Sequence, residues 1–103
     1  MVKKMEVTRD EVFQVVRGQL EVLNASLGYE FLREVTYNTP IYTSEESIAS
    51  VELVGFAVEL EEAINERFES DITLTDTEAL ANENNPYESV ERLVEFVIVR
   101  LLA

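Results

Sequence analysis

Residues 47–68 read SIASVELVGFAVELEEAINERF, and the spacing of the apolar side chains within them points to the class of fold. Apolar residues return at intervals of three and four, which is the spacing along one face of an α-helix. The residues expected on this buried face are Ile48, Val51, Val54, Val58, Ala63 and Ile64. We therefore predict that this stretch, beginning at Ser47, forms the longest internal helix of an all-α protein.

A first helix is predicted upstream, where residues 8–23 read TRDEVFQVVRGQLEVL. Thr8 followed three places later by Glu11 is a capping box, in which each side chain accepts from a backbone N–H that would otherwise lack a partner. Asn24 and Gly28 indicate where the helical pattern ends. The apolar stripe of this helix comprises Val12, Val15, Val16, Leu20 and Leu23.

A last helix is predicted near the C-terminus, with Asn85 as its cap and Pro86 as its first residue. Its wide apolar stripe comprises Val90, Leu93, Val94, Val97, Ile98, Leu101 and Leu102. A second capping box, formed by Thr75 and Glu78, predicts a short helix that fails at residues 82–85. These elements together predict a small four-helix bundle with three longer helices and a short third one, in a single domain over residues 1–103.

Residues 34–44, EVTYNTPIYTS, contain Thr, Asn and Pro and are too β-branched for a helix. We predict a long loop here, between the first and second helices. An ordered loop of this length needs apolar anchors, and Ile41 and Tyr42 are the candidates.

Composition excludes several classes of function. Eight Lys and Arg against 21 Asp and Glu give a net charge of −13, which would repel nucleic acid and anionic lipid. The chain has no Cys and no His, so we predict no disulfide, no zinc site, no Ser-His pair and no catalytic residues. The oxygen-rich residues 71–78 lack the central Gly of a calcium loop, and no metal site is predicted. We expect a cytoplasmic protein without membrane insertion.

The sequence around Ser47 resembles the attachment motif of acyl carrier proteins, Asp-Ser-Leu followed by Val-Glu-Leu-Val. Here residues 46–54 read ESIASVELV, and Ser47 matches the serine that bears 4′-phosphopantetheine. Residues 34–36, EVT, and residues 68–72, FESDI, resemble two further family segments in the same order. Members of the family are four-helix bundles with a short third helix, so the resemblance implies the same bundle.

The resemblance implies a carrier that is not itself an enzyme. A separate phosphopantetheinyl transferase would move the 4′-phosphopantetheine arm from coenzyme A to Ser47. The arm would then shuttle thioester-linked acyl groups between enzymes of fatty-acid, polyketide or lipid biosynthesis. The residues implied in partner recognition are Glu46, Ile48, Val51 and Glu52, opposite basic docking surfaces. The residues implied in an acyl-chain cleft are Val51, Val54, Val58 and Ile72. We expect a monomer.

Several positions depart from the family pattern. Glu46, Ile48 and Ala49 replace an Asp, a Leu and an acidic residue. The second helix is longer by about seven residues, close to two helical turns. Gly55 stands where the family has a bulky residue at the partner interface, which favours a specialised carrier. The alternative is an unmodified acidic helical adaptor that keeps the carrier fold and binds a basic protein.

Overall fold

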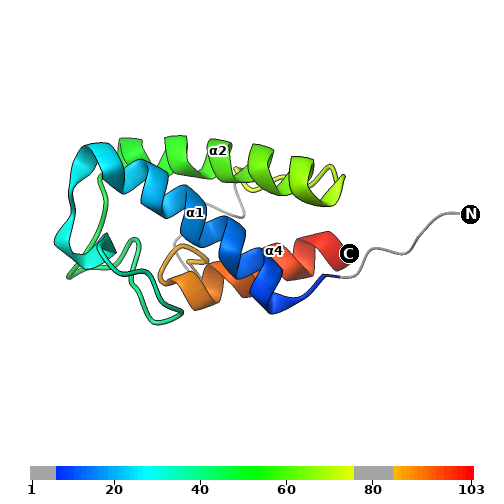
Figure 1. Ribbon diagram of the computed structural model, residues 1–103, viewed down its shortest axis with the longest axis horizontal. Helices are drawn as coiled ribbons and strands as arrows, with labels where there is room; N and C mark the ends of the chain where they lie inside the picture. Colours follow the sequence, from blue (N-terminus) through cyan, green and yellow to red (C-terminus); the bar gives the residue numbers. More distant parts are fainter. Residues whose placement is uncertain (1–6, 76–84) are drawn as a thin grey trace, which may run out of the picture.

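The protein is described by a computed structural model over residues 7–75 and 85–103. In these residues it is all-helical, without a strand. Its elements are α1 (Arg9–Leu27), the 3-10 turn η1 (Glu30–Leu32), α2 (Ser50–Phe68) and α4 (Val90–Leu102). Helix α1 packs against both α2 and α4 (Figure 1). The short helix expected from Thr75 to residue 82 falls largely outside the described residues. None of the described helices has the length and apolar character needed to cross a membrane.

Helix α1 begins and ends as its sequence predicts. The Glu11 N–H donates to Thr8 Oγ1 at 3.1 Å, and the Thr8 N–H donates to Glu11 Oε1 at 3.4 Å. Gly28 ends the helix with φ 69°, a left-handed conformation that costs little without a Cβ. The buried residues of α1 are Val12, Phe13, Val16 and Leu20. The capping box is therefore confirmed, and so is the predicted apolar stripe at Val12, Val16 and Leu20, while Val15 and Leu23 are half-buried.

Helix α2 buries a face that differs in part from the predicted one, since Ile64 is buried as expected and three predicted valines are not. Val51, Val54 and Val58 are 79%, 48% and 42% exposed, so their assignment to the core was wrong. The buried residues of the helix are Leu53, Phe56, Ala57, Leu60, Ile64 and Phe68. The side chains that the core accepts are mostly leucine, isoleucine and phenylalanine, which remove more apolar area from water than valine does.

The start of the last helix also differs from the prediction. Helix α4 begins at Val90, and the cap is Ser89, whose Oγ accepts from the Arg92 N–H at 3.2 Å. Asn85 is instead engaged in the turn before the helix. Its Oδ1 accepts from the Tyr87 N–H at 2.9 Å, and its Nδ2 donates to the Tyr42 carbonyl at 2.9 Å. The side chain that was expected to cap α4 therefore binds the long loop.

The long loop between α1 and α2 is fastened to the chain before α4 by backbone hydrogen bonds. The Tyr42 N–H donates to the Tyr87 carbonyl at 2.9 Å, and the Val90 N–H donates to the Thr39 carbonyl at 2.9 Å. Ile41 is fully buried, as predicted for a loop anchor, and Tyr42 is half-buried. The loop thus has a fixed path in spite of its irregular backbone.

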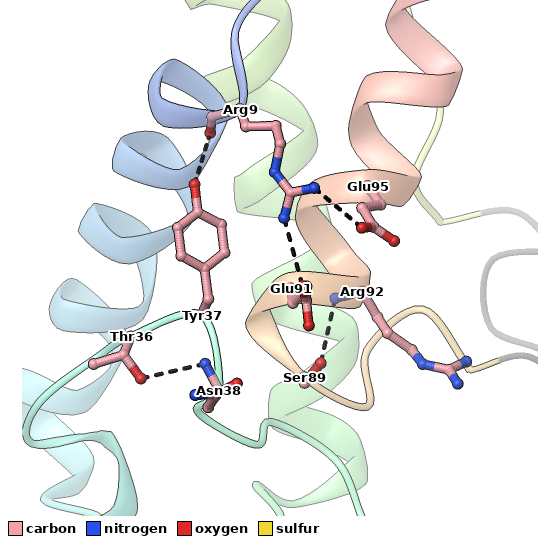
Figure 2. A network of polar contacts seen from close by, with 8 residues as sticks. All are labelled: Arg9, Thr36, Tyr37, Asn38, Ser89, Glu91, Arg92 and Glu95. Carbon is pink, nitrogen blue, oxygen red and sulfur yellow. Dashed lines mark hydrogen bonds and ion pairs between the residues drawn. The ribbon is translucent and has the colours of Figure 1, made fainter.

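A polar network joins the same loop to α1 and α4 (Figure 2). The Tyr37 hydroxyl donates to the Arg9 carbonyl at 3.4 Å. The Arg9 guanidinium pairs with Glu91 at 3.6 Å and with Glu95 at 3.2 Å, which ties the start of α1 to α4. The Tyr37 ring stacks on Phe13 with the ring centroids 4.4 Å apart. These contacts fix the loop segment that leads toward Ser47.

The chain after α2 is held by side chains of α2 itself. Asn65 Nδ2 donates to the Ile72 carbonyl at 3.0 Å, and Asn65 Oδ1 accepts from the Ile72 N–H at 2.8 Å. Glu61 Oε1 accepts from the Leu74 N–H at 2.7 Å. Leu74 is fully buried, so the segment that follows α2 returns to the core.

Candidate functional site

The candidate site is the turn that precedes α2, built around Thr43. Thr43 Oγ1 accepts from the N–H groups of Glu46 at 2.9 Å and Glu45 at 3.2 Å, and donates to the Glu46 carbonyl at 2.8 Å. Tyr42 and Ser47 face each other across an antiparallel bridge. The Thr43 side chain thereby closes the turn that leads directly into Ser47.

Ser47 lies in this turn and not within the helix. Ala49 is the N-cap of α2, so Ser47 precedes the first helical residue, Ser50, and its predicted place at the helix terminus was wrong. The reason is Ile48, which is 1% exposed and whose N–H donates to the Ile41 carbonyl at 3.0 Å. This pairing holds the chain extended until Ala49. The Ser47 side chain is half-buried, and its Oγ donates to the Ile48 carbonyl at 2.7 Å.

The start of α2 has no side-chain oxygen at its cap, because Ala49 offers none. The first N–H groups of a helix have no partner within the helix, and they carry the positive end of its dipole. The Ala49 N–H itself donates to Glu52 Oε1 at 2.9 Å. The Glu52 carboxylate therefore already lies at this helix end, while the N–H groups of residues 50–52 have no acceptor among the described residues.

Glu52 is held by structural contacts. Its Oε1 also accepts from the Tyr29 hydroxyl at 2.7 Å, and this hydrogen bond raises the pKa of Tyr29 above its ordinary value of 10.0. Asn24 fixes the backbone of Tyr29, since its Oδ1 accepts from the Tyr29 N–H at 2.6 Å and its Nδ2 donates to the Tyr29 carbonyl at 3.0 Å. The sequence analysis missed Tyr29, because no local pattern links residues so far apart along the chain.

The residues expected in partner recognition do not share one surface. Glu46 is exposed and its side chain forms no ion pair with a described residue, and Val51 is also exposed. Ile48 is buried in the core, and Glu52 is half-buried and tied to Tyr29. Glu46 and Val51 therefore remain available to a partner.

A groove of about 300 Å³ lies between α1 and α2. Its apolar lining comprises Val22, Leu23, Gly55 and Phe56, and its polar lining comprises Gln19, Ser26, Glu52 and Glu59. Val51, Val54 and Val58, expected in an acyl-chain cleft, do not line it. Ile72, the fourth expected cleft residue, is half-buried beyond the other end of α2. The sequence signal for the groove is Gly55, the residue without a side chain.

The described surface carries many carboxylates and few cations to pair with them. Arg9, Arg17, Arg33, Arg67 and Arg92 form ion pairs with acidic residues. In contrast, no described cation pairs with Glu59, Glu62 or Glu66 of α2. Within residues 7–75 and 85–103 no group of three or more acidic side chains has the arrangement of a metal site.

Two features meet at the N-terminal end of α2: a serine on a fixed turn and an open helix start. No known protein family, characterised protein or solved structure matches this chain. The chemistry of the site is therefore inferred from its own residues.

Proposed function

We propose that this protein is a carrier of the acyl-carrier type, which bears 4′-phosphopantetheine on Ser47 and shuttles thioester-linked acyl groups between biosynthetic enzymes. The observation that supports this most is the position of Ser47, on a rigid surface turn directly before a long acidic helix. The order of elements, α1, long loop and α2, agrees with the family that the sequence resembles. We also propose that the fold is a four-helix bundle whose short third helix begins at Thr75, and that the protein is cytoplasmic.

The residues around Ser47 suit an anionic attachment. A phosphodiester on this serine would be joined close to the start of α2, where the helix dipole and the N–H groups that Glu52 does not bind stabilise negative charge. The turn closed by Thr43 keeps Ser47 in place without using the serine hydroxyl. That hydroxyl bonds only the neighbouring Ile48 carbonyl, a contact that modification would replace.

The proposed modification needs little chemistry from the chain itself. On a separate transferase, the Ser47 hydroxyl oxygen would attack the phosphate on the pantetheine side of coenzyme A. The pyrophosphate bond would break, adenosine bisphosphate would leave, and a base of the transferase would take the serine proton. The arm, once attached, supplies a terminal thiol that holds acyl groups as thioesters. The protein presents Ser47 and a recognition surface, which fits a sequence without His or Cys.

The decisive experiment is intact-protein mass spectrometry after incubation with coenzyme A, magnesium and a broad-specificity phosphopantetheinyl transferase. We expect one arm mass on the wild-type protein and none on Ser47→Ala. Ser44→Ala and Ser50→Ala are matched controls on the same segment, and both are expected to gain the arm. A gain that persists in Ser47→Ala would contradict the assignment of the serine.

No gain with several transferases would contradict the carrier function and favour the second candidate, an unmodified adaptor that binds a basic protein. The observation that favours the adaptor is that Glu59, Glu62 and Glu66 of α2 form no ion pair with a described residue, so these carboxylates need no prosthetic arm to attract a cationic partner.

A further inference from the structure

Helix α4 carries an apolar surface on the side that points away from the core. Val99 and Leu102 are each 65% exposed, and they lie one turn apart on the same side of the helix. Val99 also lines a hollow of about 390 Å³ together with the half-buried Phe96. Single exposed apolar side chains are ordinary on a protein surface, whereas a continuous row of them marks a site of interaction. We call this row, Phe96, Val99 and Leu102, the α4 face.

The carboxylates next to the α4 face already have cationic partners. Glu88 pairs with Arg92 at 3.1 Å. Arg9 reaches across from α1 and pairs with Glu91 at 3.6 Å and with Glu95 at 3.2 Å (Figure 2). The negative charge around the α4 face is therefore compensated within the molecule itself.

The charge balance of α4 differs from that of α2. Arg100 adds a further cation to α4, and its guanidinium lies 4.7 Å from the centroid of the Phe96 ring. Three arginines thus stand against three glutamates at this helix, whereas α2 has one arginine, Arg67, against five glutamates, Glu52, Glu59, Glu61, Glu62 and Glu66. Two copies of a chain with a net charge of −13 repel each other. They can approach most easily where the local charges balance.

We propose that the α4 faces of two copies of this chain pack together in a symmetric dimer, with Val99 and Leu102 of one copy buried against the other. A twofold axis brings the same surface of each copy together, and a face that is apolar and locally neutral is complementary to itself. The 13 residues of α4 extend over about 20 Å. An interface one helix long belongs to the small, transient class, so the dimer forms at high protein concentration. Such a dimer differs from the monomer expected from the sequence.

The paired charges favour a second copy over a basic protein at this face. The cations of a basic protein would meet carboxylates that Arg9 and Arg92 already neutralise. The dimer also does not require modification of Ser47, because the α4 face contains neither that serine nor the turn that leads into it. Failure of the dimer and failure of the carrier function are therefore separate results.

The test is sedimentation velocity of the full chain over protein concentrations from the micromolar to the millimolar range. We expect the wild type to pass from monomer to dimer. Val99→Glu brings like charges together in the interface and should raise the dimer dissociation constant about tenfold or more. The matched control is Val22→Glu, which adds the same charge to a valine of α1 that is also 65% exposed and lies outside the α4 face. It should dimerise as the wild type does.

A second variant and a salt series complete the test. Leu102→Glu, on the same face, should also raise the dissociation constant, and circular dichroism verifies that each variant is folded. Added sodium chloride should strengthen the wild-type dimer, because salt screens the repulsion between the two net charges and leaves the apolar contact in place.

Three results would overturn the proposal. A wild-type protein that stays monomeric at millimolar concentration would reject a second copy as the occupant. Equal dissociation constants for Val99→Glu and Val22→Glu would place the contact outside the α4 face. A wild-type dimer that weakens as salt is added would show that ion pairs hold it together and not the apolar row.

Discussion

The two sides of α2 have similar apolar spacing, but one side is buried and the other is exposed. One side places Leu53, Leu60 and Ile64 in the core, with Leu60 and Ile64 fully buried. The other presents Val51, Val54 and Val58 to solvent, at the same three- and four-residue intervals. The first turns of this helix are thus apolar nearly all round. The comparison shows that helical periodicity identifies a helix, while the choice of its buried side depends on what the rest of the chain packs against it.

We expect the two sides to differ also in their contributions to stability and to partner binding. Full burial of a Leu or Ile side chain contributes about 1.5–3 kcal/mol, whereas a valine that keeps much of its surface in water contributes little. The exposed side adjoins Gly55 and the unpaired carboxylates. We therefore expect substitutions on one side to change the free energy of unfolding and substitutions on the other to change binding.

The largest expected effect is on the buried side. Leu60→Ala should lower the free energy of unfolding by about 2–5 kcal/mol, because it removes a fully buried side chain and leaves a cavity. Val58→Ala on the exposed side is the matched control and should change it by less than about 0.5 kcal/mol. Urea denaturation followed by circular dichroism measures both. Similar losses in the two variants would contradict the assignment of sides.

A smaller effect is expected where the two sides meet, at Glu52. Glu52→Ala removes the acceptor of the Tyr29 hydroxyl and of the Ala49 N–H, and should cost about 1–2 kcal/mol. Glu59→Ala removes a carboxylate from the same helix without breaking a contact, and should stay within about 0.5 kcal/mol of wild type. The same denaturation experiment applies. Equal values for the two variants would show that Glu52 is as free as Glu59.

The smallest effect is the pH dependence that Glu52 imposes on Tyr29. Because the folded-state pKa of Tyr29 lies above the ordinary value of 10.0, its contribution to stability is present at neutral pH and is lost as the pH rises through the raised pKa. The difference in ultraviolet absorbance between wild type and Tyr29→Phe, followed against pH, isolates this hydroxyl. Titration of Tyr29 at or below its ordinary pKa would contradict the hydrogen bond. In Glu52→Gln the pKa of Tyr29 should return toward the ordinary value.

The sequence predicted which helices form better than it predicted where they begin and which of their faces are buried. The capping box of Thr8 and Glu11 is local, so it could be recognised from residues three apart. Asn85 and Pro86 have an equally plausible local pattern, yet Asn85 binds the Tyr42 carbonyl from a distant loop and α4 begins later, at Val90. Helix α2 begins at Ser50 and not at the predicted Ser47 for a similar reason, since the Ile48 N–H donates to the Ile41 carbonyl. In each case a long-range contact outweighed a local preference.

The candidate site was predicted in part. Ser47, Glu46 and Val51 were proposed from their order in the chain, and the structure leaves Glu46 and Val51 exposed near the start of α2. Tyr29 as the partner of Glu52 and the groove over Gly55 were not predicted. Both depend on how α1 and η1 approach α2, which no spacing within α2 encodes.

By itself the sequence determined an acidic, all-α protein, because charge and helical periodicity are properties of residues and their near neighbours. Only the tertiary structure decided that Val51, Val54 and Val58 face water and that Gly55 lines a groove. The core has room for one side of α2, and the larger side chains of Leu53, Phe56 and Leu60 remove more apolar surface from water than the valines would. Which side of α2 is buried therefore depends on how the whole molecule packs.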